Sequence, residues 1–202
     1  MGKQIARAKN GKEKQKTYAK YMLQYNKAIR NEFYLEAIMI DYAMMEDRLV
    51  ALLHYVGIVS RNQQKLCVNK FCRADIRKML GYKEKAAIRI NNISVKVKIF
   101  DVLMSLAEDR ASEYLNSIVA HVDASGSRDE IKNLCAAITE WCDTRNQYVH
   151  ALLNKNYDAL QEGLKGFAET GHGIARRIDA CVKVIKLNST KEKKGEKNVR
   201  TA

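Results

Sequence analysis

The chain has 202 residues, of which 47% are hydrophobic, so it can bury one substantial core and is not expected to be disordered. It has no proline, which favours long helices joined by short turns, and no apolar run long enough for a membrane-spanning helix. Its net charge of +13 is concentrated at the ends, with +8 in residues 1–30 and +4 in residues 186–202. Such basic ends favour a polyanionic partner such as RNA, and the alternative is a purely solubilising role.

The cysteines and the N-terminal residues indicate compartment and cofactors. The five cysteines are odd in number and include no C-x-x-C pair, so we predict reduced thiols rather than a disulfide framework or a zinc site. No apolar signal-peptide core follows the basic N-terminus, so we expect a cytoplasmic protein. We predict no metal and no cofactor.

The first predicted element is a basic amphipathic helix over residues 12–30. Aromatic and apolar residues recur there at helical spacing between lysines: Tyr18, Tyr21, Met22, Tyr25 and Ile29. We expect this stripe to pack on the core, although tyrosines can also stack on RNA bases. Four lysines of this helix are candidates for contacts with RNA phosphates: Lys12, Lys14, Lys16 and Lys20.

Residues 31–57 form the most apolar predicted helix, with Asn31 as its candidate N-cap and Gly57 at its end. Apolar positions nearly surround this helix, so we expect it to be the central, most buried element. Four acidic residues interrupt its apolar surface: Glu36, Asp41, Glu46 and Asp47. A carboxylate buried on such a helix needs a cation or hydrogen-bond donors.

Three helices are predicted in the middle of the chain. Residues 64–82 follow a turn and read as a helix that ends at Gly81. Residues 86–109 are predicted to be helical, although residues 93–99 alternate like a strand, because a lone strand would have no partner in this sequence. Residues 111–122 read as a short helix.

Two longer helices complete the chain. The first begins at Ser127 and Glu130, which form an S-x-x-E capping box. Its apolar residues make one face: Ile131, Leu134, Cys135, Ile138, Trp141 and Cys142. The last helix covers residues 157–187, and we expect it to bend or break at Gly171-His172-Gly173.

These elements predict an all-α protein. We expect a bundle of about six to seven helices over residues 31–187. A basic amphipathic extension precedes the bundle at residues 1–30, and a basic tail follows it at residues 188–202.

The chain reads CDTRNQYVHALLN at residues 142–154, directly after the apolar face that ends at Cys142. This stretch contains Arg145-Asn146-x-x-x-His150. Few arginines of the chain are followed by asparagine, so R-N-x-x-x-H arises by chance in roughly 6% of such chains. On a helix Asn146 and His150 share a face. Arg145 continues the apolar stripe while its long side chain reaches outward, so we expect Arg145 and His150 to flank one surface groove.

These residue types suit the cleavage of RNA without a metal. A guanidinium is always charged and its planar fork fits a phosphate, whereas an imidazole exchanges a proton near neutral pH. The ribose 2′-hydroxyl would attack the neighbouring phosphate while His150 moves a proton and Arg145 stabilises the phosphorane. Asn146 would hold either side chain in orientation. The structural alternative is an ion pair between Arg145 and a carboxylate beside a half-exposed His150.

An all-α bundle with R-N-x-x-x-H after a long amphipathic helix resembles the HEPN superfamily (higher eukaryotes and prokaryotes nucleotide-binding). That superfamily includes toxins, abortive-infection proteins and the nuclease domains of type VI CRISPR effectors. The resemblance implies that Arg145 and His150 are the catalytic pair and that Asn146 supports them. It also implies that Glu46 is the acidic residue that orients Arg145.

The resemblance further implies a homodimer in which two motifs form one composite site. An apolar stripe ending in Trp141, Tyr148 and Leu152 offers surface beside the motif for this contact. Some members of the superfamily have a tyrosine two residues after the histidine, where this chain has Leu152. This difference argues against the toxin subgroup that pairs with a nucleotidyltransferase antitoxin.

The predicted function is therefore a metal-independent endoribonuclease that acts in phage defence or as a toxin. RNA and a second copy of the chain are the expected partners, and an antitoxin or an effector complex is a further candidate. One alternative is a non-catalytic RNA-binding or assembly module of a defence complex, in which the motif only grips phosphate. The other is a helical subunit of a larger complex.

Overall fold

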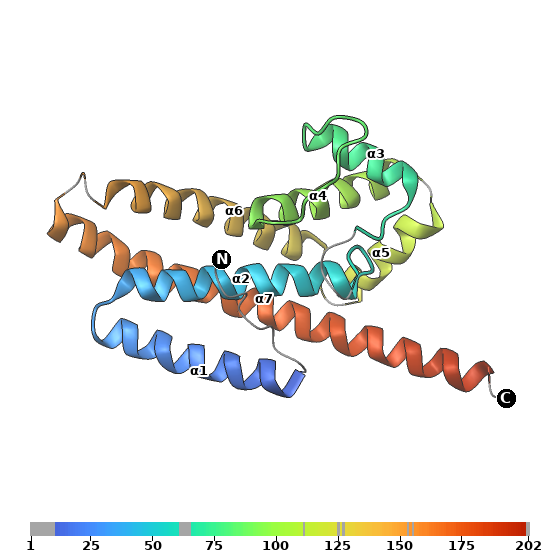
Figure 1. Cartoon of the computed structure of the whole chain (residues 1–202). Coiled ribbons are helices and arrows are strands. Elements are labelled where there is room, and N and C mark those ends of the chain that lie inside the picture. Colours follow the sequence, from blue (N-terminus) through green and yellow to red (C-terminus); the bar gives the residue numbers. More distant parts are fainter. Residues whose placement is uncertain are drawn as a thin grey trace, which may run out of the picture.

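The computed structural model describes residues 11–60, 66–110, 112–124, 126, 128–152, 154 and 156–200. Over these residues the protein is all-α, with seven helices and no strand, as predicted (Figure 1). The helices are α1 Gly11–Arg30, α2 Tyr34–Tyr55, α3 Lys70–Met79, α4 Ile93–Asp109, α5 Glu113–Asp123, α6 Arg128–Ala151 and α7 Tyr157–Arg200. No helix in the described part of the chain is long and apolar enough to cross a bilayer.

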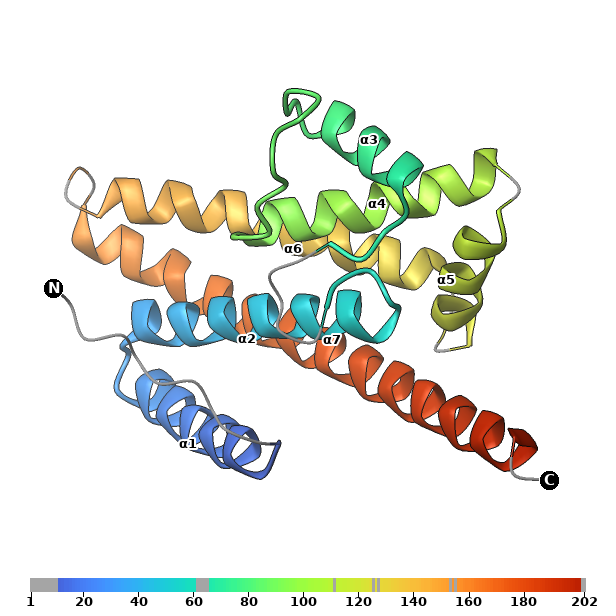
Figure 2. The same ribbon diagram turned by 45° about the vertical axis from the view of Figure 1, so that its right-hand side comes forward.

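The helices are arranged around the contact between α2 and α7. α1 packs on one side of this pair, and α4 and α6 pack on the other side, as the two views in Figures 1 and 2 agree. α3 covers the outer surface of α4, while α5 lies at the end of the bundle against α4 and α7. The C-terminal part of α7 projects beyond the other helices (Figure 1).

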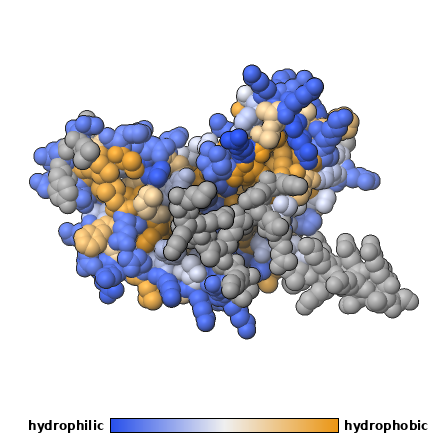
Figure 3. Space-filling model, in the orientation of Figure 1, coloured by the Kyte–Doolittle hydropathy of each residue, from blue (hydrophilic) through white to orange (hydrophobic). Residues whose placement is uncertain are grey.

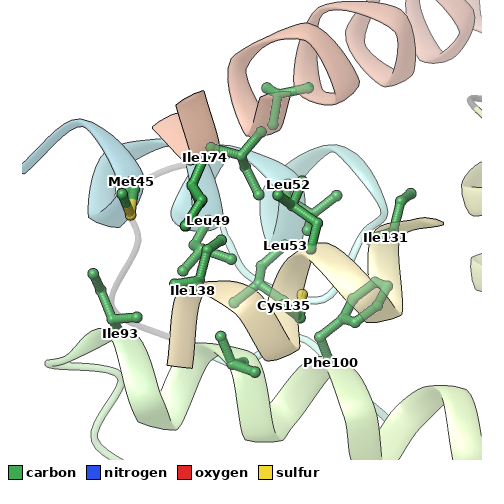
Figure 4. Packing of buried hydrophobic residues seen from close by; sticks show 14 of the residues in the cluster. Met45, Leu49, Leu52, Leu53, Ile93, Phe100, Ile131, Cys135, Ile138 and Ile174 are labelled. Atoms are coloured by element: carbon green, nitrogen blue, oxygen red, sulfur yellow. The ribbon is translucent and has the colours of Figure 1, made fainter. Parts of the chain in front are cut away.

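The core lies where α2, α4, α6 and α7 meet. Figure 4 shows Leu49 and Leu53 of α2 facing Phe100 of α4 and Cys135 of α6, and all four side chains are fully buried. α2 supplies more buried apolar residues than any other described helix outside α7, which confirms the prediction that it is a central, buried element. α1 contributes Tyr25, which is 5% exposed, and Tyr18, Met22 and Ile29 also pack on the core as expected. Tyr21 of the predicted stripe is 54% exposed instead.

Several helix boundaries differ from the sequence-based ones for local reasons. Asn31 does not cap α2, because Asn31 and Glu32 form a turn in which Glu32 adopts φ 60° and α2 begins only at Tyr34. α3 begins at Lys70 rather than near residue 64, where the Asn69 side chain accepts a hydrogen bond from the Cys72 amide at 2.8 Å. Gly57 adopts φ 83° just beyond α2, in keeping with its predicted place at the end of this helix.

The alternating segment that starts at Ile93 is helical, as predicted. α4 starts there because the Asn92 side chain accepts a hydrogen bond from the Val95 amide at 2.8 Å, which caps the helix. Residues 86–92 precede this cap and are not helical. The predicted capping box of α6 involves Ser127, which lies outside the described residues.

The expected break in the last helix is wrong. α7 runs without interruption from Tyr157 to Arg200 and includes both Gly171 and Gly173. α6 lies close to α7 at Gly171, where a Cβ would be only 2.5 Å from the Trp141 ring, and this ring stacks on Phe167 with centroids 4.8 Å apart. The Trp141 Nε1–H also donates to the Phe167 carbonyl at 3.1 Å. At its other end α7 continues beyond residue 187 and includes most of the predicted tail, up to Arg200.

Each acidic residue of α2 has a partner on another helix. Glu36 accepts from Gln24 of α1 at 2.6 Å, and Glu46 accepts from the buried Lys96 of α4 at 2.8 Å. Asp47 accepts from Lys14 and from the Tyr18 hydroxyl, and also pairs with its neighbour Arg48. Helices α1 and α4 thus supply the cations and hydrogen-bond donors that the sequence indicates for these three carboxylates.

Asp41 is the most buried of these carboxyl groups, and it connects three helices. It is fully buried, and its Oδ1 lies 3.1 Å from Nδ1 of His172 on α7. The His172 ring stacks on Tyr25 of α1 with centroids 4.1 Å apart. His172 is therefore half-buried within an uninterrupted helix. Burial raises the pKa of Asp41 to about 8, and burial followed by the Arg176 charge lowers the pKa of His172.

We predict that Gly171→Ala and Gly173→Ala have opposite effects on stability. A Cβ at Gly171 would lie 2.5 Å from the Trp141 ring, so overpacking should lower the free energy of unfolding by about 1–3 kcal/mol. A Cβ at Gly173 would meet nothing within 4 Å, so higher helix propensity should raise it by about 1 kcal/mol. Urea denaturation measures both changes. Equal effects of the two substitutions would contradict the continuous helix and its close contact with Trp141.

We also predict that stability falls between pH 6.5 and 8. In the unfolded chain aspartate ionises near pH 4 and histidine loses its proton near pH 6.5, whereas the folded Asp41–His172 pair keeps one proton up to about pH 8. The folded state then binds more protons over this window, so the free energy of unfolding should drop by up to about 2 kcal/mol. Asp41→Asn should flatten this dependence in urea denaturation. An unchanged slope in the variant would show that other groups cause it.

Candidate functional site

The motif lies on the last turns of α6, where this helix passes the first half of α2. Buried Ile138 and Trp141 hold α6 against the core, and Arg145 follows one turn later. Arg145 is half-buried, whereas Asn146 and His150 are exposed. The helix therefore carries the motif from the protein interior to the surface.

The Arg145 guanidinium packs on α2 instead of forming an ion pair. Its Cζ lies 4.3 Å from the centroid of the Tyr42 ring, and its Nη2 lies 3.8 Å from Sδ of Met39. Its Nη1 donates to Oδ1 of Asn146 at 2.7 Å, while its buried Nε has no hydrogen-bond partner. Within the described residues, no carboxylate pairs with Arg145. Asn146, Tyr42 and Met39 are therefore the described side chains that contact this guanidinium.

The structure brings Asn146 to Arg145 but does not bring His150 to it. Five residues on a helix correspond to a rotation of about 140°, so Arg145 faces α2 while His150 faces solvent. The His150 ring makes no hydrogen bond within the described part of the chain, and its backbone carbonyl accepts from Asn154 at 3.3 Å. The expectation that Arg145 and His150 flank one groove is therefore not met within one chain.

Glu46 does not orient Arg145 in the structure. Its carboxylate accepts a hydrogen bond from Lys96, whose side chain is only 2% exposed and needs a counter-charge. The demand of this buried ammonium explains the difference from the expected role. Tyr42, one turn before Glu46 on α2, is the residue that holds the guanidinium instead.

Tyr42 and Met39 are the site residues that the sequence does not reveal. They are three residues apart on α2, so periodicity places them on one helix face. Nothing in the sequence indicates that this face meets the last turns of α6. A tyrosine within reach of an arginine becomes visible only once both helices are placed.

The candidate RNA-binding lysines of α1 are not equivalent. Lys12, Lys16 and Lys20 are exposed, as a contact with phosphate requires. Lys14 is half-buried and pairs with Asp47 of α2, so its ammonium holds α1 on the core. Three of the four predicted lysines thus remain candidates for RNA contacts.

The surface beside the motif is apolar, but residues other than those of the predicted stripe form it. Trp141 and Tyr148 both pack on Phe167 of α7, so they are used within the chain. The exposed apolar residues here are Met39 of α2, 51% exposed, and Val149 of α6, 41% exposed. Figure 3 shows hydrophobic residues gathered between the left-hand ends of α2 and α6.

The other chemical groups near the motif are few. Burial raises the pKa of the Cys142 thiol to about 11, so it is protonated at neutral pH. Among the described residues, no cluster of three or more His, Cys, Asp or Glu side chains is placed to hold a metal ion. A hollow of about 460 Å³ lies between the α1–α2 turn and the start of α7, and no motif residue lines it.

No family model, no curated protein and no solved structure matches the chain. The resemblance to the HEPN superfamily therefore consists of the R-N-x-x-x-H motif on a long helix of an all-α protein.

We predict that Glu46 stabilises the fold through Lys96. Glu46→Gln should lower the free energy of unfolding by about 1–3 kcal/mol, because it leaves the buried ammonium without its counter-charge. Adding Lys96→Met should recover part of this loss. Glu36→Gln on the same helix is the matched control, because its partner Gln24 is neutral, and it should change stability by less than about 0.5 kcal/mol. Equal effects at the two positions in urea denaturation would contradict the assignment.

Proposed function

We propose that the protein is a metal-independent endoribonuclease of the HEPN type. The observation that supports this most is the state of Arg145, a half-buried guanidinium that no carboxylate of the described chain neutralises and that Asn146 and Tyr42 hold in place. A cation kept in this way suits a phosphate, because binding requires no prior breakage of an ion pair. His150, exposed on the same helix, supplies an imidazole, the side chain that most often serves as a general acid or base.

The chemistry follows from these groups. The ribose 2′-oxygen forms a bond to the adjacent phosphorus as its proton passes to a general base, and the bond from phosphorus to the 5′-oxygen breaks as that oxygen is protonated. Arg145 stabilises the extra negative charge on the phosphorane. The products are a 2′,3′-cyclic phosphate and a 5′-hydroxyl. This route uses one group as base and one as acid.

A single chain supplies only part of this arrangement. Because Arg145 and His150 point in directions about 140° apart on α6, one motif does not present both to the same phosphate. A two-fold dimer places two copies of one surface opposite each other, so the Arg145 of one chain can face the His150 of its partner. The exposed Met39 and Val149 beside the motif supply apolar area for such a contact. We therefore propose a homodimer with a composite site.

The biological setting follows from the class of the proposed enzyme. An endoribonuclease of this class suits phage defence or a toxin, held in check in the cytoplasm by an antitoxin or an effector complex.

The second candidate is a non-catalytic RNA-binding or assembly module. The contact of Arg145 with Tyr42 and Met39 favours it, since a guanidinium fixed on an aromatic ring can grip a phosphate without any partner histidine. In that case phosphate binding would depend on Arg145 and not on His150.

We predict that purified protein cleaves RNA in the presence of EDTA and leaves 2′,3′-cyclic phosphate ends. His150→Ala should lower the cleavage rate by about 10²–10⁴-fold and Arg145→Ala by about 10²–10³-fold. His150→Ala should leave the melting temperature unchanged, because its exposed ring makes no hydrogen bond among the described residues. Arg145→Ala also removes packing on Tyr42, so Arg145→Lys should accompany it as the variant that keeps the charge.

Gln147→Ala is the matched control for this experiment, because Gln147 is exposed on the same helix and occupies an unspecified position of the motif. Mixing the Arg145→Ala and His150→Ala proteins tests the composite site, since a mixed dimer has one site with an intact Arg145 and an intact His150. Partial recovery of cleavage is expected. Full activity of His150→Ala, or cleavage that requires Mg²⁺, would overturn the proposed mechanism. Phosphate-dependent binding of RNA without any cleavage would select the second candidate.

A further inference from the structure

The solvent face of α1 carries a row of five cations, interrupted between Lys20 and Lys27 by the exposed Leu23, and we call this row the α1 ridge. Its residues lie at positions that one helix face brings together: Lys12, Lys16, Lys20, Lys27 and Arg30. At 100° per residue they fall within an arc of about 80°, and at 1.5 Å per residue they span about 27 Å. All five side chains are exposed. Within this arc there is no acidic residue.

The opposite face of α1 is occupied by the core. Tyr25 and Ala28 are buried, and Tyr18 hydrogen-bonds Asp47 of α2 at 2.6 Å. Lys14 lies on this inner face and pairs with Asp47, which removes it from the ridge. The orientation of α1 is therefore fixed, and its packing directs the five ridge cations toward solvent. Figure 3 shows a mostly hydrophilic surface over α1 at the lower edge of that view.

The charge pattern of the ridge opposes the stability of its own helix. Lysines four residues apart repel one another, and each such pair destabilises a helix by about 0.2–0.5 kcal/mol. Lys12–Lys16 and Lys16–Lys20 are two such pairs in succession. A helix face that serves only to be solvated commonly alternates acidic and basic residues. Pairs of opposite charge on such a face stabilise the helix instead of destabilising it. The row of like charges thus indicates a ligand that neutralises it.

We propose that the α1 ridge binds the sugar-phosphate backbone of RNA, without sequence preference and separately from the cleavage motif. A straight row of cations without aromatic pockets recognises a linear polyanion through phosphate charge. The identity of this polyanion as RNA rests on the proposed function. A membrane surface fits less well, because helices that lie on bilayers insert an apolar face, and the apolar face of α1 is packed on the core.

The ridge and the motif lie on opposite sides of the protein. α1 packs on one side of the α2–α7 pair and α6 on the other, as Figures 1 and 2 show. RNA held along the ridge therefore lies away from Arg145 of the same chain. The ridge should raise affinity for RNA while leaving the reaction at the motif unchanged once RNA is saturating.

The test measures how RNA binding depends on salt. Fluorescence anisotropy with a 2′-O-methyl RNA oligonucleotide, which lacks the attacking hydroxyl, reports binding independently of cleavage. The triple variant Lys12→Gln, Lys16→Gln and Lys20→Gln removes three ridge charges. Between about 50 and 200 mM salt, the slope of log K against log salt should become shallower by about 2 for a single strand. The cleavage rate at saturating RNA should match that of the unaltered protein.

The control variant removes the same charge elsewhere. Lys70→Gln, Lys78→Gln and Lys98→Gln alter exposed lysines of α3 and α4, and the salt slope should stay within about 0.5 of the unaltered value. Equal salt slopes for the two triple variants would contradict the proposal that the ridge binds RNA, because net charge alone would then explain binding. Binding to vesicles of anionic lipid, with no ridge-dependent binding of RNA, would also overturn it. If the protein binds RNA through the ridge but does not cleave it, the proposed function is contradicted, whereas the proposal that the ridge binds RNA stands.

Discussion

The contact between α2 and α7 is the constraint on which the rest of the structure depends. From Leu164 to Ile185 one set of buried residues of α7 recurs at alternating spacings of four and three: Leu164, Ala168, Gly171, Ala175, Ile178, Val182 and Ile185. Leu160, Ile174 and Ser189 are buried beside this stripe. This spacing keeps one stripe of a straight helix against its neighbours over most of its length. Each glycine inside a helix costs about 1 kcal/mol relative to alanine, whereas burial of one large aliphatic side chain contributes about 1.5–3 kcal/mol. The stripe therefore outweighs its glycines, and α7 continues through them.

The small residues in this stripe also set the position of the candidate site. Because Gly171 has no Cβ, the Trp141 ring lies directly on α7, and α6 is held close to the α2–α7 pair. The last turns of α6 then reach the first half of α2, where Tyr42 receives the guanidinium of Arg145. The neighbouring carboxylates of α2 are engaged elsewhere, Asp41 with His172 and Glu46 with Lys96. The same packing that builds the core thus leaves the half-buried Arg145 without a counter-charge among the described residues.

Sequence patterns predict the helices of this protein well, and contacts between helices poorly. The all-α class, the central place of residues 34–55 and the helical state of residues 93–99 follow from periodicity and from the absence of a partner strand. The break at Gly171 was expected because glycine weakens helices locally, but the buried stripe that overrides it needs knowledge of what α7 packs against. The motif itself is visible in the sequence. The partner of Glu46 is not, because Lys96 is 50 residues away and its burial depends on how α4 packs.

Under the proposed function, the ridge on α1 and Arg145 would carry out two separate tasks, the binding of RNA and its cleavage. The ridge on α1 is exposed, regular and remote from α6, so any attraction that it exerts on a polyanion acts alike on the ground state and the transition state. Such uniform binding lowers the concentration of RNA needed for saturation but does not accelerate a chemical step. Arg145 differs in each respect, since it is half-buried, is held by Tyr42 and Asn146, and also contacts Met39, so water screens its charge less than that of an exposed cation. A charge in that environment is suited to discriminate a phosphorane from a phosphate, whereas five solvated charges on a helix are suited only to hold the chain to which the phosphate belongs.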